Sequence, residues 1–144
     1  MIFLPDVNVW LALVAAEHVH SAEARAFVEE EASTLALCRV THMAILRLLT
    51  NPHVMGLDVK TPQQAWEISD RLLAAPNVIM EAEPNGLDAA WKKMTPTRSK
   101  GSNFWTDAYL AAFAQVTGYP VVTFDRGFSG YPNIPVKLLG TRRH

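Results

Sequence analysis

The sequence has one cysteine, no long hydrophobic run and few acidic residues in its last third. The first two of these shortages exclude an intrachain disulfide and a membrane-spanning helix. Cys38 is the only cysteine among 144 residues, so no intrachain disulfide can form, as is usual in a reducing compartment. The most apolar stretch, residues 1–16, is interrupted by Pro5, Asp6 and Asn8 and falls short of the ~18 apolar residues of a membrane span. It also lacks the basic start and uncharged core of a signal peptide. We therefore expect a cytoplasmic protein without membrane association.

The composition is typical of a folded chain. Hydrophobic residues make up 49% of the sequence and charged residues 19%, which supplies enough apolar material for a sizeable core and argues against intrinsic disorder. The length is close to that of one domain, and no repeat, low-complexity tract or linker divides it. We predict a single domain over residues 1–144.

Acidic residues are scarce toward the end of the chain. Residues 1–88 contain 5 Lys and Arg against 12 Asp and Glu, a net charge of -7, whereas residues 89–144 contain 8 against 2, a net charge of +6. These values balance to the overall charge of -1. The two carboxylates of the basic region are Asp107 and Asp125, so their positions need an explanation.

Short apolar segments alternate with helical patterns along the chain. We predict buried strands over residues 1–5, 34–38, 77–80, 119–124 and 136–139. Capping residues and apolar periodicity predict helices over residues 6–14, 21–31, 41–49, 61–75, 85–91 and 104–117, with Thr41 and Thr61 as N-caps. Residues 53–60 and the polar, basic segment 95–103 are expected to be loops, the second of them mobile. Strands joined by helices form parallel crossovers, which predicts a three-layer α/β/α domain with a central, mainly parallel sheet.

Two of the predicted strands are followed directly by a carboxylate, Asp6 after the first and Asp125 after the fourth. The carboxyl ends of parallel strands lie at one edge of a sheet, where α/β proteins bind ligands, so these side chains converge if their strands are neighbours. Asp107, near the start of the preceding helix, is expected at the same edge. Three carboxylates repel one another unless a cation neutralises them, and oxygen ligands without His or Cys favour Mg²⁺ or Mn²⁺ over zinc.

Each carboxylate also has a purely structural interpretation. Asp6 is a suitable N-cap for the first helix, Asp107 complements the dipole of its helix, and Asp125 suits the turn that follows it. Three independent capping roles do not require all three residues to lie at one edge of the sheet. Their joint occurrence there favours a chemical role.

Four segments have a distinctive order and spacing: MIFLPDVNVWLAL at the start, RVTHMAILRLLTNP at 39–52, TDAYLAAFA at 106–114 and VVTFDRGF at 121–128. Over nearly the whole chain, they resemble PIN-domain ribonucleases, specifically the bacterial VapC-type toxins of toxin–antitoxin pairs. The resemblance implies a PIN-like fold and a Mg²⁺-dependent endoribonuclease, with Mn²⁺ as a substitute, that hydrolyses phosphodiester bonds of structured RNA such as tRNA or rRNA. It implies that Asp6, Asp107 and Asp125 are catalytic and bind the metal. Asn8 and Thr123 are implied to be polar neighbours of the metal site.

One position departs from the family pattern. PIN domains commonly carry a Glu three residues before the Arg of the middle motif, and this chain has Ala44 there, ahead of Arg47. We interpret this as a smaller metal site, in which a second ion is held weakly or only together with RNA. His42 is interpreted as a packing or capping residue rather than a substitute ligand.

Two other functions are open alternatives. A PIN domain that binds RNA or its antitoxin without cleaving is supported by Ala44, although the retained carboxylates argue against it. A haloacid-dehalogenase-like phosphatase also places an Asp after its first strand, but it needs a second Asp two residues later, where this chain has Asn8.

RNA contacts and protein partners complete the hypothesis. Basic side chains would supply local positive potential, and Trp105 is a candidate for stacking on an unpaired base, with core packing as the alternative. The candidate RNA-binding residues are Arg47, Lys92, Lys93, Arg98, Lys100, Trp105 and Arg126. The resemblance further implies a cognate VapB-like antitoxin, with its C-terminal segment in a groove of the toxin, and a homodimer.

Overall fold

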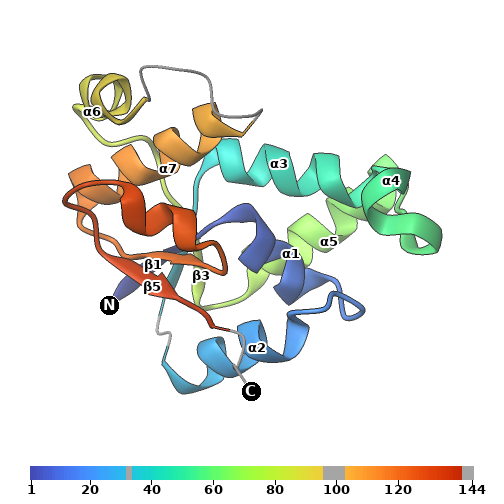
Figure 1. Ribbon diagram of the computed structural model, residues 1–144. Coiled ribbons are helices and arrows are strands. Elements are labelled where there is room, and N and C mark those ends of the chain that lie inside the picture. The colour runs from blue at the N-terminus through green and yellow to red at the C-terminus, as the bar shows by residue number, and fades with distance from the viewer. Residues whose placement is uncertain (32–33, 96–102, 141–144) are drawn as a thin grey trace.

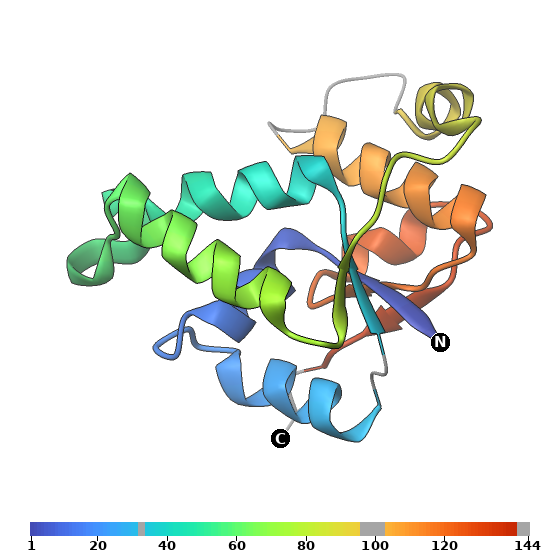
Figure 2. The ribbon, with the colours of Figure 1, turned by 180° about the vertical axis from the view of Figure 1, so that it is seen from behind.

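A computed structural model describes residues 1–31, 34–95 and 103–140, which form three layers with a sheet in the middle (Figures 1 and 2). The sheet has the order β3-β2-β1-β4-β5, and all its neighbouring strands are parallel. The strands are β1 (Ile2–Pro5), β2 (Thr34–Leu37), β3 (Val78–Met80), β4 (Val121–Thr123) and β5 (Val136–Leu138). The predicted fold class is confirmed.

Helices cover both faces of the sheet. They are α1 (Val7–Val14), α2 (Ser21–Glu30), α3 (Arg39–Leu49), α4 (Pro52–Met55), α5 (Pro62–Ala74), α6 (Leu87–Met94) and α7 (Phe104–Thr117), with 3-10 helices η1 (Gly56–Asp58) and η2 (Arg126–Gly130). The buried side chains form two hydrophobic clusters. In one, the sheet packs against α1, α2, α3 and α5, and in the other it packs against α6, α7 and η2. None of the helices in the described part of the chain is long and apolar enough to cross a membrane.

The strand sequences explain why both faces are covered. Successive strand residues point to opposite faces, so Phe3 and Val122 join the first cluster while Leu4 and Val121 join the second. Because the central strands β1, β2 and β4 bury apolar side chains on both faces, the sheet is stable only with a helical layer on each side. The carboxyl ends of β1 and β4 lie between these two layers, and they lead directly into Asp6 and Asp125.

Several local predictions are confirmed and two are wrong. Thr61 and Gln64 form the expected capping box at the start of α5. Thr41 does not cap α3, because the helix begins at Arg39, two residues after the end of β2, with Cys38 in the N-cap position. Residues 53–60 are not all loop: Asn51 caps α4 by accepting a hydrogen bond from the His53 N–H, and η1 follows. The mobility expected for residues 95–103 concerns mainly 96–102, which lie outside the described residues.

Candidate functional site

Asp6 lies at the junction of β1 and α1, where its carboxylate has two partners. Its Oδ1 atom accepts a hydrogen bond of 3.1 Å from the Val9 N–H, which makes it the N-cap of α1. Its Oδ2 atom accepts a hydrogen bond of 2.5 Å from the Thr123 hydroxyl at the end of β4. The side chain is 6% exposed. The structural interpretation of Asp6 as a helix cap is therefore confirmed, and it coexists with a position at the edge of the sheet.

Thr123 connects two of the three carboxylate residues. It is fully buried, donates its hydroxyl to Asp6 and accepts a hydrogen bond of 2.9 Å from the Asp125 N–H. The Asp125 carboxylate in turn accepts a bond of 2.8 Å from the Gly127 N–H and caps η2. One hydroxyl thus fixes the Asp6 side chain relative to the backbone of Asp125. This contact exists because β1 and β4 are neighbours in the sheet.

Asp107 is held in the first turn of α7, near the other two carboxylates. Burial, followed by repulsion from Asp125 and Asp6, raises the pKa of Asp107 to about 6. Burial also raises the pKa of Asp6, with Asp125 adding to the effect, although hydrogen bonds from Thr123 and Val9 oppose it. Among the described residues, no hydrogen bond to the Asp107 carboxylate is present. The carboxylates are therefore close enough for Asp125 and Asp6 to raise the pKa of Asp107 further, as expected if all three lie at one edge of the sheet.

The three carboxylates line one cleft of about 400 Å³ between α1, α3 and α7. Asn8, Ala44 and Arg47 lie on the side of α1 and α3, and Asn103 and Thr106 lie near the start of α7. The predicted polar neighbours are both near the acids, Asn8 in the cleft wall and Thr123 beneath it. Ala44 leaves a methyl group where the family pattern commonly supplies a fourth carboxylate.

The donor chemistry of the cleft fits a magnesium-type cation, but the side chains do not form a closed cage. No three His, Cys, Asp or Glu side chains within residues 1–31, 34–95 and 103–140 are arranged as they stand to hold one metal ion. Mg²⁺ commonly binds through one or two carboxylates and keeps several water ligands, so it does not need such a cage. Burial, followed by repulsion from Asp125 and Asp6, raises the pKa of Asp107, and a bound cation would oppose both effects by stabilising the charged carboxylate.

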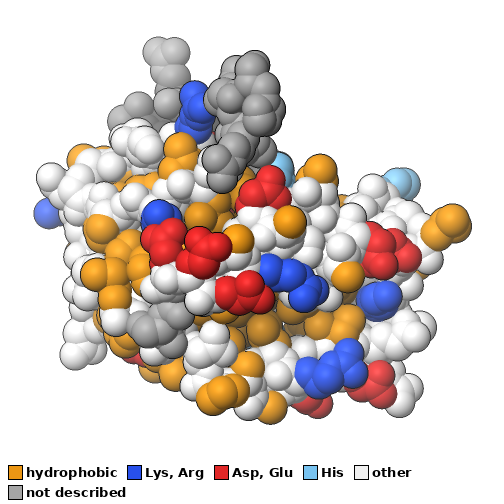
Figure 3. Space-filling model, turned by 90° about the horizontal axis from the view of Figure 1, so that it is seen from below, with side chains coloured by type: hydrophobic (Ala, Val, Ile, Leu, Met, Phe, Trp, Pro, Cys, Tyr) orange, Lys and Arg blue, Asp and Glu red, His pale blue; other side chains and the backbone are white. Residues whose placement is uncertain are grey.

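The predicted basic residues are not all gathered at the cleft. Arg47 lines it, and Lys93 lines a second pocket that begins at Asp107 and Asp125. Lys92 and Arg126 are exposed but line neither space. Arg98 and Lys100 lie outside the described residues. Among the described residues on the face seen in Figure 3, acidic and basic side chains are interspersed and form no continuous basic surface.

Two aromatic predictions have clear outcomes. Trp105 is 55% exposed, so core packing is excluded and its ring stays accessible beside Trp91, with the two centroids 6.3 Å apart. His42 is buried between α3 and α5, where Nε2 lies 2.7 Å from the Ser69 hydroxyl and Nδ1 lies 2.9 Å from an Arg39 nitrogen. The interpretation of His42 as a packing residue is confirmed.

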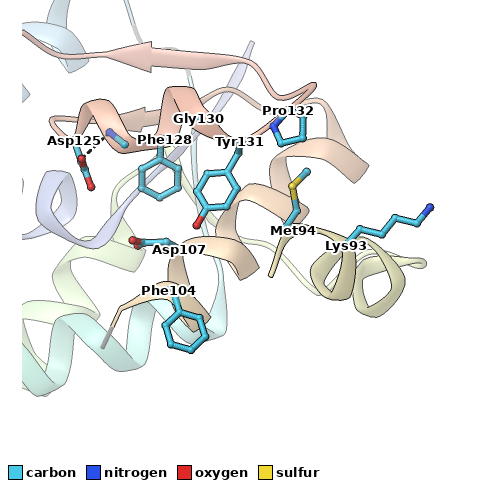
Figure 4. Close-up of a pocket in the computed structure, with 10 residues that line it drawn as sticks. Lys93, Met94, Phe104, Asp107, Asp125, Phe128, Gly130, Tyr131 and Pro132 are labelled. Atoms are coloured by element: carbon cyan, nitrogen blue, oxygen red, sulfur yellow. Dashed lines mark hydrogen bonds between the residues drawn. The ribbon is translucent and has the colours of Figure 1, made fainter. Parts of the chain in front are cut away.

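The second pocket contains residues that sequence reasoning missed. It has a volume of about 450 Å³ and shares Asp107, Asp125 and Phe128 with the acidic cleft. Figure 4 shows that Phe104, Phe128 and Tyr131 surround it together with Met94. The aromatic residues of the segments 104–109 and 124–131 were a signal for this pocket, since both segments flank a predicted acidic residue.

Comparisons with known proteins agree over nearly the whole chain. The PIN domain family model matches residues 3–133. Ribonuclease VapC41 of Mycobacterium tuberculosis is 37% identical over 142 residues, covering 94% of this chain and 97% of that protein. Ribonuclease VapC43 of the same organism is 29% identical over 129 residues, covering 88% and 87%.

Solved structures share the fold. The crystal structure of VapBC2 from Rickettsia felis, bound to a DNA fragment from the promoter, has a TM-score of 0.71 at 15% identity and covers 96% of this chain and 98% of its own. Mycobacterium tuberculosis VapC20, described as a toxin that cleaves the sarcin-ricin loop, has a TM-score of 0.69 at 19% identity, with coverages of 95% and 99%. The chain therefore belongs to the PIN-domain family and is of the VapC ribonuclease type.

Proposed function

We propose that this protein is the toxin of a toxin–antitoxin pair and that it cleaves RNA internally by metal-dependent hydrolysis. The observation that carries the proposal is the convergence of Asp6, Asp107 and Asp125 in one cleft, where burial, together with repulsion from neighbouring carboxylates, raises the pKa values of Asp6 and Asp107. Capping explains each position alone, but it does not explain why Asp107 is kept among like charges. A function that needs a cation does.

Asp6 and Asp107 would hold Mg²⁺, or Mn²⁺ in its place, with Asp125 contributing directly or through water. When bound, the ion neutralises the carboxylates, polarises the scissile phosphate and increases the acidity of water. Hydrolysis adds water to phosphorus and breaks one P–O bond, and family membership implies products with 5′-phosphate and 3′-hydroxyl ends. With three acids, a second ion would be held weakly or only together with RNA.

The protein's own groups keep the acids in place. The Thr123 hydroxyl and the Val9 N–H fix both oxygens of Asp6, so little rearrangement is needed when a cation arrives. The Gly127 N–H holds Asp125 in the same way. Arg47 at the cleft and Lys93 beside it offer positive charge to the RNA backbone, and exposed Lys92, Arg126 and Trp105 extend this surface.

Structured RNA such as tRNA or rRNA is the proposed substrate class, acted on in the cytoplasm. The partners are a VapB-like antitoxin and a second copy of the chain. Three clustered carboxylates form a suitable receptor for a guanidinium group, which supports an antitoxin that inserts an Arg into the cleft. The described association of VapC20 with the sarcin-ricin loop makes that loop a sensible test substrate.

The test uses antitoxin-free protein, a mixed tRNA and rRNA pool and a sarcin-ricin loop oligonucleotide. Each RNA is incubated with chelator, with Mg²⁺ or with Mn²⁺, beside the Asp6→Ala variant. Cuts that need the metal and are absent from the variant support the nuclease. Cuts that persist in chelator or in Asp6→Ala protein contradict it.

A second candidate, a PIN domain that binds RNA without cleaving, is favoured by the methyl group of Ala44 in the cleft. The same experiment separates the two. RNA that is bound but stays intact at every metal concentration supports the binding module, because a nuclease with a weak site would still respond to excess metal.

A further inference from the structure

The pocket in Figure 4 is built by three segments that are far apart in the sequence. Lys93 and Met94 come from the end of α6, Phe104 and Asp107 from the start of α7, and the remaining lining residues from the β4–β5 connection. These remaining residues are Asp125, Gly127, Phe128, Gly130, Tyr131 and Pro132. The cleavage chemistry proposed above uses only the acidic end of this space.

The pocket is aromatic along its length and charged at its two ends. Phe128 is 2% exposed and forms the floor, and the ring of Tyr131 packs on it with a centroid distance of 5.7 Å. The rings of Tyr131 and Phe104 are only partly buried, so part of each stays accessible. Figure 4 shows the Tyr131 hydroxyl directed toward Asp107 and the Lys93 side chain extending away from the carboxylates. Burial, with Asp107 and Asp125 nearby, raises the pKa of Tyr131.

We propose that this pocket receives one unpaired nucleobase of the RNA, immediately beside the bond that is cut, with Tyr131 as its stacking platform. The inference rests on the proposed nuclease function. Proteins that recognise unpaired bases stack them on aromatic rings, and such stacking tolerates any base because each has a π-face. Asp107 and Asp125 line both the pocket and the acidic cleft. When a base lies in the pocket, the phosphate of the same nucleotide therefore lies at the acidic cleft. Lys93 lies at the end of the pocket away from the carboxylates, where its charge would attract the phosphate of a neighbouring nucleotide.

Binding of a base in the pocket would also offset the repulsion between the carboxylates and the RNA backbone. Without a cation, three carboxylates repel a phosphate, whereas an aromatic ring attracts a base without any ion. Base stacking in this pocket therefore persists in chelator, in contrast to cleavage. This difference allows the inference to be tested separately from the nuclease chemistry.

The first test measures stacking directly. A single-stranded RNA oligonucleotide carries one 2-aminopurine, moved from position to position, and is titrated with protein in chelator. We expect its fluorescence to fall where the 2-aminopurine stacks in the pocket, and the fall to be lost in Tyr131→Leu protein, which keeps apolar bulk against Phe128 but has no ring. Tyr131→Phe should restore it. Trp66→Ala, which removes an aromatic ring 53% exposed on α5 and outside both spaces, is the matched control and should leave it unchanged.

The second test is a double-mutant cycle on cleavage. Replacing the nucleotide beside the mapped cut by an abasic residue should slow wild-type cleavage by roughly 5- to 100-fold, the range expected for one lost stack. The same abasic RNA should be cut by Tyr131→Leu protein no more slowly than intact RNA, because the ring and the base act as a pair.

Two results would overturn the inference. If RNA is bound and cut but no position is quenched, or if Tyr131→Leu quenches as wild type does, the pocket does not hold a base and an apolar side chain of a protein partner becomes its occupant. If the protein neither binds nor cuts any RNA, the proposed function fails as well, and the two failures are thereby distinguished.

Discussion

The acidic cleft and the aromatic pocket share Asp107, Asp125 and Phe128 but are built in opposite ways. The cleft is formed where strands end and helices begin, and buried hydrogen bonds from Thr123 and Val9 hold Asp6 in place. The pocket is formed by the ends of α6 and α7 and the β4–β5 connection, and ring packing shapes it. The same edge of the sheet thus has an acidic half held by hydrogen bonds, for which we propose the chemistry, and an aromatic half, for which we propose base recognition.

This difference predicts that mutations in the cleft and in the pocket affect RNA cleavage differently. A change in the cleft should abolish cleavage of every RNA, whereas a change in the pocket should matter only for RNA with an unpaired base at the cut. The largest effect is expected in the cleft.

Asp6→Asn should lower the rate of RNA cleavage by more than roughly 100-fold, because loss of even a neighbour of a metal ligand costs about 10- to 100-fold. Asn keeps the N-cap of α1, and removing a buried carboxylate whose pKa is raised should not lower the melting temperature. Cleavage rates on an intact and an abasic RNA, with thermal melts, check both statements. Equal activity of variant and wild type would remove Asp6 from the chemistry.

Thr123→Val should lower cleavage by about 10- to 100-fold and destabilise the fold by about 1–3 kcal/mol. The variant leaves a buried Asp6 oxygen and the Asp125 N–H without the hydroxyl that joins them. Thr123→Ser retains that hydroxyl and is the matched control. Rates and denaturant unfolding measure the two effects, and a Val variant that matches the Ser variant in rate would show that this hydroxyl does not position the acids.

The sequence predicted the cleft much better than the pocket, for a physical reason. Asp6 and Asp125 follow apolar strands directly, so periodicity places both at the carboxyl edge of a parallel sheet. The pairing of β1 with β4, on which their convergence depends, comes from the structure. Phe104 and Tyr131 meet only because loops of irregular path bring their segments together, and hydrophobic periodicity carries no information about such paths. Trp105 was equally open, because an apolar residue in the first turn of an Ala-rich helix can face either way.

The start of α3 shows another limit. Thr41 has the side chain of a preferred N-cap, yet the helix begins at Arg39, because β2 ends at Leu37 and the extended backbone of Cys38 between them already serves as the N-cap. The route of the chain out of the sheet outweighs a local capping preference worth about 1 kcal/mol.

Ala44→Glu should increase the difference between the acidic cleft and the aromatic pocket, because residue 44 lines only the cleft and the substitution adds a negative charge there. A fourth carboxylate attracts the cation more strongly, so the Mn²⁺ concentration for half-maximal cleavage should fall a few-fold to about tenfold. Ala44→Gln has the same length without the charge and is the control. Metal titrations of cleavage measure the shift, while quenching of 2-aminopurine in chelator should not change. Identical titrations for the Glu and Gln variants would show that position 44 does not act on the metal.

The smallest effect is the pH dependence of stability caused by Asp107. Its pKa of about 6 in the folded protein lies above the ordinary value of 3.8, so its stabilising effect is complete below pH 3.8 and is lost as the pH rises through 6. In chelator, Asp107→Asn should therefore be more stable than wild type at pH 7, by about 1 kcal/mol after allowance for solvent screening, or roughly 3 °C. This gap should close toward pH 4, and Mg²⁺ at pH 7 should narrow it by stabilising wild type.

The control for this gap is Asp88→Asn, which changes an exposed carboxylate that also lies in the first turn of a helix, the neighbouring α6. Thermal melts of both variants and wild type from pH 4 to pH 8 separate the local effect from a general one. A stability gap that is constant across this range would mean that burial and repulsion from Asp125 and Asp6 do not raise the pKa of Asp107. In that case the carboxylates would not need a cation to coexist, and the acidic cleft would lose the electrostatic property that distinguishes it from the aromatic pocket.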